Sequence, residues 1–183
     1  AQLAEARRRA WRAGVADRVT FELMDYRDVS ETYDHIVSIE MFEAVGEQYW
    51  PTYFQQVHDR LKPGGHAGIQ VITIAEQRFE DYRRSADFIQ RYIFPGGMLP
   101  SPGRFLAGAE TAGLEALDVF TFGADYARTL AHWDQAVREK ADSLAAMGYD
   151  ARFQRLWHAY LCYCRVGFET GRIDVMQTVL TRR

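Results

Sequence analysis

Two carboxylates, Glu40 and Glu43, stand among apolar neighbours in the stretch VSIEMFEAVG, residues 37–46. The stretch begins as a buried strand should, with alternating apolar side chains. Moving a carboxylate out of water is costly unless another group pairs with it. The pattern therefore indicates that each carboxylate has either a buried partner or a chemical role.

The two cysteines, Cys162 and Cys164, are the other reactive side chains of note. Two residues apart on a predicted helix, their side chains diverge, so they are not expected to form a disulfide with each other. Reduced thiols fit a cytoplasmic protein. We expect the Cys162 side chain to pack in the hydrophobic core.

The composition bounds the class of protein. The chain has 183 residues, is 48% hydrophobic and carries a formal net charge of -3. These values suit one ordinary domain with a hydrophobic core, and the slight acidity argues against nucleic acid as the main partner. No apolar run approaches the roughly 20 residues that span a bilayer. The aromatic share of 14% also suits an apolar ligand cavity.

The elements that must position these residues alternate along the chain. Strands are predicted at residues 18–23, 33–40, 66–74, 114–123 and 174–182. Helices are predicted at residues 2–13, 49–61, within 85–103, within 102–113, and at 126–147 and 151–170. Strands that alternate with helices predict a doubly wound α/β sheet, and the strand at 33–40 is apolar enough to be internal to it. The two long helices before the last strand are interpreted as an insertion or a lid.

Six segments together resemble one family. They are DYRD, SIEMFEAVG, YWPTYFQQVHDRLKPGG, DFIQRYIFPGGMLP, FGADYARTL and IDVMQTVLTR. The family is that of the cyclopropane-fatty-acyl-phospholipid synthases, with mycolic acid cyclopropane synthases and fatty-acid methyltransferases as relatives. The resemblance covers essentially the whole chain. It implies an α/β, Rossmann-like class I fold that uses S-adenosylmethionine, with a helical insertion at about residues 126–170.

One feature of that family is absent from these 183 residues, namely the glycine-rich loop E-x-G-x-G-x-G that approaches the cofactor. The acidic residue that ends the family's second strand is absent too. The resemblance therefore implies that residues 1–183 are the C-terminal portion of a single methyltransferase domain, or that another chain supplies the rest. Alone, the chain is expected to bind S-adenosylmethionine weakly or not at all and to be inactive. The strand predicted at 18–23 would then have no neighbour joining it to the sheet.

The activity that the resemblance implies is methylation of a double bond in an unsaturated phospholipid acyl chain. The alkene attacks the sulfonium methyl group, a carbocation forms, and loss of a proton closes a cyclopropane ring. The reaction needs a dry apolar tunnel and a base, which in the family is thought to be a bound bicarbonate ion. The protein is expected to be cytoplasmic and to associate transiently with the inner face of the membrane. A homodimer is left open.

The resemblance assigns the ion cluster to four residues of this chain. Glu43 matches a glutamate that helps to hold bicarbonate, although a carboxylate in the first turn of a helix is also favoured there by the helix dipole. Tyr126 matches a tyrosine that donates its hydroxyl to the ion. The alternative is an aromatic core residue at the start of a helix. Cys164 matches a cysteine near the ion, or is a small buried hydrophobe. Gln70 stands where several members have histidine, and an amide can donate and accept but not titrate.

Glu40 is less readily assigned. It lies where contacts to adenine and the sulfonium are expected, but many relatives carry glycine there, and a structural ion pair is an equal alternative.

Cofactor and substrate residues are also implied. For S-adenosylmethionine they are Gln2, Asp25, Tyr26, Arg27 and Ile39. A polar turn explains residues 25–27 equally well. For the wall of the acyl channel they are Tyr92, Phe94, Gly96 and Gly97. Residues 92–97 are explained equally well as core residues followed by a turn. No metal ligands are predicted.

Two rival functions remain. The same fold could release the proton differently and give a methylene product, or methylate another small molecule. A chain without the glycine-rich loop could also be a non-catalytic module that binds lipid.

Overall fold

The computed structural model describes residues 2–182. The chain divides into two compact units, Ala1–Glu31 and Thr32–Arg183, and each is described by itself.

The first unit is built on helix α1 (Gln2–Arg12), which ends before Gly14 at a positive φ of 67°. Short 3-10 turns follow at Ala16–Arg18 and Tyr26–Asp28. The prediction of a strand at residues 18–23 is wrong. These residues pair with no strand in the described part of the chain, and Leu23 is 91% exposed. An alternating pattern gives a strand only where a neighbour satisfies its backbone N–H and C=O groups.

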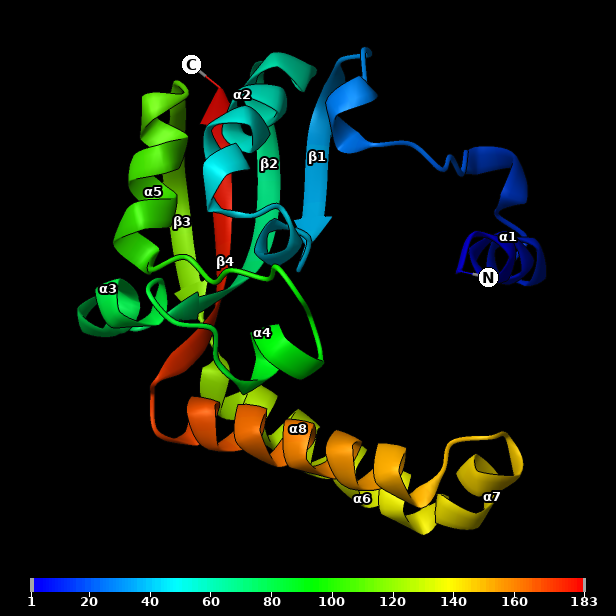
Figure 1. The fold of residues 1–183 in the computed structure, drawn as a ribbon. Coiled ribbons are helices and arrows are strands. Elements are labelled where there is room, and N and C mark those ends of the chain that lie inside the picture. Colours follow the sequence, from blue (N-terminus) through cyan, green and yellow to red (C-terminus); the bar gives the residue numbers. More distant parts are fainter. Residues whose placement is uncertain (1, 183) are drawn as a thin grey trace. The chain divides into compact units, whose positions relative to one another are not determined.

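The second unit contains a four-stranded sheet in the order β1-β2-β4-β3 (Figure 1). The strands are β1 (Tyr33–Ile39), β2 (Leu61–Ile74), β3 (Leu114–Thr121) and β4 (Ile173–Arg182). β1 runs parallel to β2, whereas β4 is antiparallel to both β2 and β3. The prediction that β1 is internal is also wrong for this sheet, because β1 forms its edge and Val37 is 74% exposed.

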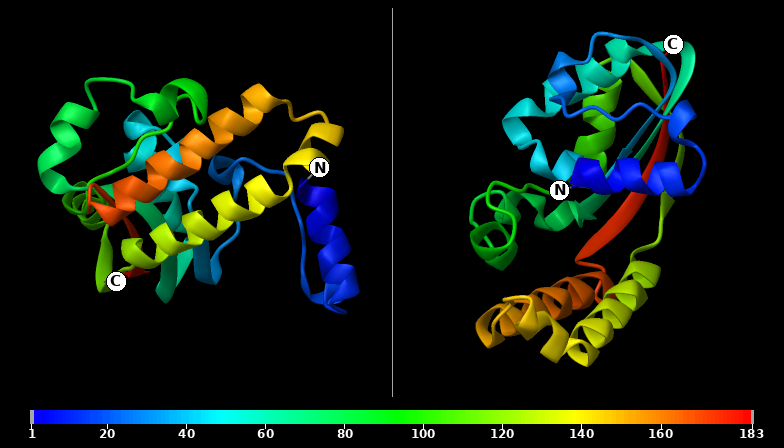
Figure 2. Two further views of the ribbon diagram at one scale, coloured as in Figure 1. Left: turned by 90° about the horizontal axis from the view of Figure 1, so that it is seen from below. Right: turned by 90° about the vertical axis from the view of Figure 1, so that its right-hand side faces the viewer.

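One face of the sheet packs against α2 (Trp50–Arg60) and α5 (Pro102–Thr111), as Figure 2 shows. Alternate residues of β2, including Ile69 and Val71, are buried on this face. Phe42, fully buried, lies at the centre of an aromatic cluster with ring centroids 4.9–5.3 Å away. The other rings of the cluster belong to Trp50, Tyr53, Phe54 and Phe105.

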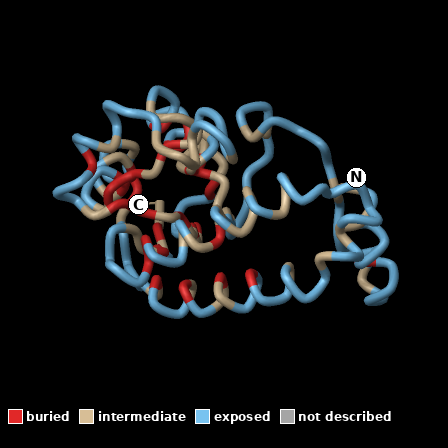
Figure 3. Tube along the Cα trace, turned by 60° about the horizontal axis from the view of Figure 1, so that its bottom comes forward, coloured by how far each residue is buried: buried red, intermediate tan, exposed pale blue. Residues whose placement is uncertain are grey.

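Three helices stand between β3 and β4 in the sequence. They are α6 (Gly123–Glu139), α7 (Ala141–Ala146) and α8 (Ala151–Glu169). Buried positions recur on one side of α6 at 123, 127, 130 and 134, the helical spacing that a packed face requires. In Figure 3, buried positions recur at intervals along the long helix at the lower edge of the view. Two short helices, α3 (Phe79–Tyr82) and α4 (Phe88–Tyr92), precede α5. In the described residues, no helix is long and apolar enough to cross a membrane.

Asp174, at the start of β4, fixes the beginning of α6. Its Oδ1 accepts from the backbone N–H of Gly123 at 2.7 Å, which occupies one of the free donors at a helix N-terminus. A side chain at position 123 would collide with this carboxylate, because a Cβ there would lie 2.6 Å from Asp174 Oδ1.

Asp174→Ala is expected to lower the free energy of unfolding by about 1 kcal/mol, the usual cost of a lost helix cap. Urea denaturation measures it. Asp174→Asn keeps an acceptor oxygen and should lose less, so equal losses for the two variants would show that the cap does not matter.

Candidate active site

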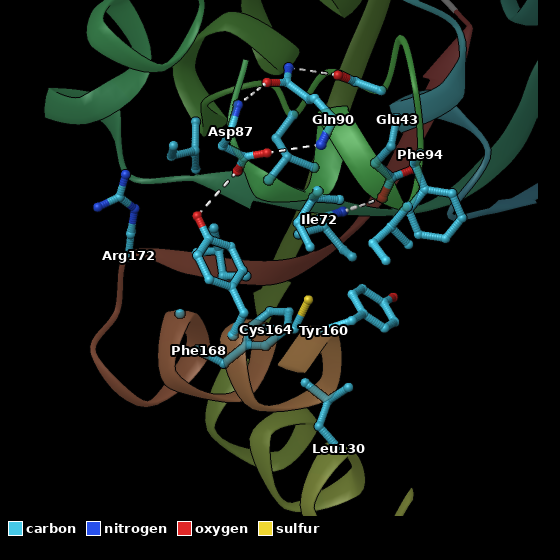
Figure 4. A pocket seen from close by; sticks show the side chains of 18 of the residues that line it. Glu43, Ile72, Asp87, Gln90, Phe94, Leu130, Tyr160, Cys164, Phe168 and Arg172 are labelled. Carbon is cyan, nitrogen blue, oxygen red and sulfur yellow. Dashed lines mark hydrogen bonds between the residues drawn. The ribbon is translucent and has the colours of Figure 1, made fainter. Parts of the chain in front are cut away.

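A cavity of about 940 Å³ lies in the second unit between the carboxyl ends of β1 and β2, the segment around α4, and helices α6 and α8. Most of its lining is apolar, with Ile72, Leu130 and Phe168 among the residues (Figure 4). Glu40 and Glu43 are its two glutamates. An apolar cavity with a few convergent polar groups is the usual form of a small-molecule site.

Glu43 is held by both main chain and side chain. It lies in the 3-10 turn Phe42–Ala44, and the buried ring of Phe42 anchors that turn in the core. β1 ends at Ile39, opposite Gln70, so the N–H of Ile72 lies beyond the ladder between β1 and β2. Glu43 Oε1 accepts from this N–H at 2.6 Å, as Figure 4 shows. The carboxylate therefore takes the place that a longer β1 would have filled.

The second oxygen of Glu43, Oε2, is buried and has no hydrogen-bond partner among residues 2–182. Burial raises the pKa of Glu43 to about 7, outweighing the hydrogen bond from Ile72. A carboxyl with this pKa exchanges its proton near neutral pH, which suits acid–base work.

Glu40 adopts an unusual backbone conformation. Its φ is +51°, and no other non-glycine residue in the described chain has a positive φ. A left-handed conformation costs an L-residue about 1–2 kcal/mol, which explains why glycine suits this position. Such strain persists where surrounding contacts hold it and is common at functional sites.

Two neutral donors converge on the Glu40 carboxylate. Gln70 Nε2 donates to Oε1 at 2.8 Å, and the Tyr126 hydroxyl donates to Oε2 at 3.2 Å. No cation pairs with Glu40 among residues 2–182, so the ion pair considered as an alternative is not formed there. The structure thus brings together Glu40, Gln70 and Tyr126.

Tyr126 enters the site from the first turn of α6. Its ring packs against Phe168 of α8 at a centroid distance of 5.1 Å. Burial, with the charge of Glu40 beside it, raises the pKa of its hydroxyl well above the usual value. Tyr126 is therefore a neutral hydrogen-bond donor at any physiological pH.

Cys164 also lines the cavity, on α8 beside Tyr160 (Figure 4). Burial raises the pKa of its thiol to about 12, so the sulfur is neutral and not a nucleophile. Cys162 lies near His158 and Asp134, where its Sγ is 3.7 Å and 3.8 Å from the two ring nitrogens. The ligand atoms of Asp134, His158 and Cys162 all lie within 4.8 Å of one another, close enough to share a metal ion.

The predicted channel residues divide into two pairs. Phe94 and Gly97 line the cavity. A Cβ at Gly97 would lie 3.1 Å from the carbonyl oxygen of Phe94, so glycine permits the close turn. Tyr92 and Gly96 are not part of the lining, and Tyr92 is 63% exposed.

The predicted cofactor residues fall in both units. Gln2 begins α1. Asp25 is the N-cap of the 3-10 turn Tyr26–Asp28, which contains Tyr26 and Arg27. Arg27 pairs with Asp25 through two side-chain bonds of 2.8 and 2.9 Å, which hold the pKa of Asp25 at about 2. These side chains fix the turn, so backbone groups are what the turn offers a ligand. Ile39, in the second unit, ends β1 and is 58% exposed.

Sequence reasoning missed two contacts of the site. Asp87 caps α4 and its Oδ2 accepts from the Tyr163 hydroxyl at 3.3 Å, which ties the segment of α4 to α8. Gln177 donates to Gln70 at 2.7 Å. The D-F-I-Q capping pattern of residues 87–90 was the available signal for the first, whereas the second depends on strand register.

The chain is similar in sequence to known proteins along almost its whole length. The family model described as "Mycolic acid cyclopropane synthetase" matches residues 1–178. The tuberculostearic acid methyltransferase UfaA1 of Mycobacterium tuberculosis is 42% identical over 97% of this chain and 42% of its own length. The cyclopropane-fatty-acyl-phospholipid synthase of Escherichia coli K12 is 36% identical over 90% of this chain and 41% of its own. The chain thus spans less than half the length of these relatives.

A solved structure gives the same result. The mycolic acid cyclopropane synthase CmaA1, crystallised with SAH and CTAB, superposes with a TM-score of 0.79 at 28% identity, covering 88% of this chain and 59% of that chain. The fold is accordingly the Rossmann-like fold of methyltransferases that use S-adenosylmethionine, as the sequence predicts. The chain belongs to the mycolic acid cyclopropane synthetase family.

Proposed function

We propose that the protein containing this chain transfers a methyl group from S-adenosylmethionine to the double bond of an unsaturated lipid acyl chain. The observation that carries the proposal is the combination of an apolar cavity with two carboxylates and a phenol at one place in its wall. A hydrocarbon chain fits such a wall, and a reaction that forms a carbocation needs a proton acceptor there and no bulk water.

S-adenosylmethionine would supply an electrophilic methyl group. In the second unit, we propose that Ile39 contacts S-adenosylmethionine. The exposed apolar surface of Ile39 fits the face of a purine ring.

The identity of the proton acceptor depends on Glu40. The bicarbonate ion that the resemblance implies would need the donors of Gln70 and Tyr126, and both donate to the Glu40 carboxylate. The residues therefore do not fit that ion in the expected place, and we propose that the Glu40 carboxylate accepts the proton itself. Glu43 Oε2 favours a bound ion, because it has no hydrogen-bond partner in the described part of the chain and such an ion would satisfy it.

Substrate and product are narrower proposals. The preferred substrate is an unsaturated phospholipid, reached by transient attachment to the inner face of the membrane, and the preferred product is a cyclopropane ring. A methylene product needs the same base and the same loss of one proton, so it is the alternative. The names of the relatives include both a phospholipid synthase and a tuberculostearic acid methyltransferase.

The test uses the protein as it is naturally encoded, with any segments that accompany these residues. It is incubated with S-adenosylmethionine carrying a CD₃ group and with vesicles of dioleoyl phospholipid. We expect the acyl chains to gain one CD₂ unit by mass spectrometry, and NMR then separates ring from methylene. Unlabelled acyl chains, with the cofactor consumed on another acceptor, would contradict the proposal.

A further inference from the structure

Gln177 is linked to the site although it lies on a different strand from every residue named in the proposed reaction. On β4 it stands directly opposite Gln70 of β2. Its Nε2 donates to Gln70 Oε1 at 2.7 Å, and Gln70 Nε2 donates in turn to Glu40 Oε1 at 2.8 Å. Three side chains from three parts of the sequence thus form one hydrogen-bonded row that ends on the carboxylate.

The contacts at both ends of Gln70 favour the same direction of this row. An ionised carboxylate can only accept, so Gln70 must turn its NH₂ group toward Glu40. Its carbonyl oxygen then faces Gln177, which must donate. If Gln70 turned over, its carbonyl oxygen would face the carboxylate, and two acceptor oxygens would oppose each other with no proton between them.

An amide needs such an external constraint. Its two ends have nearly the same shape, so packing alone does not choose between the two orientations of Gln70. The Tyr126 hydroxyl donates to the other carboxylate oxygen of Glu40, Oε2, so it does not constrain the orientation of the Gln70 amide. In the described residues, Gln177 is the group that donates to Gln70 Oε1.

We propose that Gln177 is a positioning residue that holds the Gln70 amide with its N–H toward the Glu40 carboxylate, the proposed proton acceptor. This inference rests on the proposed function. Gln177 is exposed in the sheet, so substitutions there change packing little.

Three variants separate donation from bulk. The side chain of Gln177→Lys can only donate hydrogen bonds. The side chain of Gln177→Glu has the size of glutamine, but it only accepts when ionised. The side chain of Gln177→Leu neither donates nor accepts and adds no charge. We expect kcat of methyl transfer to stay within about 2-fold for the lysine variant and to fall about 10-fold for the glutamate variant, the scale of a misplaced catalytic group. The leucine variant should lie between them.

A second measurement needs no activity. In the 183-residue chain, NMR follows the exchange of the Gln70 side-chain N–H protons with water, which the bond to Glu40 should slow. Gln177→Glu should abolish this protection and Gln177→Lys should keep it.

The outcomes are distinguishable. Absent methyl transfer in the unsubstituted protein, with the expected NMR contrast, would overturn the proposed function and support the positioning of Gln70. Equal exchange in all variants, or a glutamate variant with the turnover of the unsubstituted protein, would overturn the inference about Gln177.

Discussion

Replacing Glu40 by glutamine is expected to lower kcat by roughly 10²- to 10⁴-fold, the range for a lost general base. An amide of the same size occupies the place of the carboxylate but does not take up the proton. The contacts that hold position 40 should largely persist, because the amide oxygen can still accept from Gln70 or Tyr126. Single-turnover kinetics with a dioleoyl lipid measures the chemical step.

Glu40→Gly provides the matched control. Glycine tolerates the φ of +51° that strains glutamate, so the variant should fold at least as well at this position. Removing the side chain releases the donors of Gln70 and Tyr126. If these donors can then hold a bicarbonate ion, added bicarbonate should partly restore the glycine variant but not the glutamine variant. A glutamine variant with near-normal turnover would remove Glu40 from the chemistry.

Replacing Glu43 by glutamine is expected to lower kcat by roughly 10²-fold, since it removes an ionisable group beside the proton acceptor. The amide oxygen can still accept from Ile72, so the 3-10 turn should hold its place. Affinity for S-adenosylmethionine should change little, because that interaction is proposed to lie elsewhere. Separate determination of kcat and of cofactor binding by calorimetry checks both parts.

The same variant should change how stability depends on pH. In the folded chain the pKa of Glu43 is raised from 4.5 to about 7, so the folded state binds this proton more tightly than the unfolded state. Stability from this group is therefore fully present below about pH 4.5 and is lost as pH rises to about 7. Over this interval the loss amounts to about 2–3 kcal/mol at most.

Glu43→Gln should abolish that loss. Urea denaturation of the 183-residue chain at pH 5 and at pH 8 would show the variant gaining on the original chain at the higher pH. Glu110→Gln, at an exposed position of α5, is the matched control and should behave like the original chain. A large loss of stability with normal turnover would make Glu43 a structural residue and end its catalytic assignment.

The sequence predicted most elements because their patterns are local. β2, β3 and β4 follow alternating or continuous apolar runs, and helices α2, α5 and α8 follow helical spacing and clear end signals. The strand prediction at residues 18–23 was wrong for a physical reason. Alternating apolar residues show which side chains a strand could bury, but not whether a neighbouring strand is present to pair with it. β1 is apolar enough to be internal, but this sheet gives it a neighbour on one side only.

The site was predicted in part. Glu43, Tyr126, Gln70 and Cys164 were chosen through the family resemblance; Glu43, Tyr126 and Cys164 line the cavity, and Gln70 contacts it through Glu40. What the sequence did not show is that Gln70 and Tyr126 both donate to Glu40. That convergence depends on a left-handed backbone at Glu40, on the register of β1 with β2, and on the start of α6 being fixed by Asp174. None of these leaves a local pattern.

The central claim is that Glu40 accepts the proton in place of a bound ion, and the dependence of turnover on bicarbonate tests it most directly. The unsubstituted protein is assayed in buffer stripped of carbon dioxide and again after bicarbonate is restored. If the Glu40 carboxylate is the acceptor, the two rates of methyl transfer should be equal within error. A rate that falls sharply when bicarbonate is removed and recovers when it is restored would contradict the account. It would show that bicarbonate is the base, and that Gln70 and Tyr126 donate to the ion instead of to Glu40.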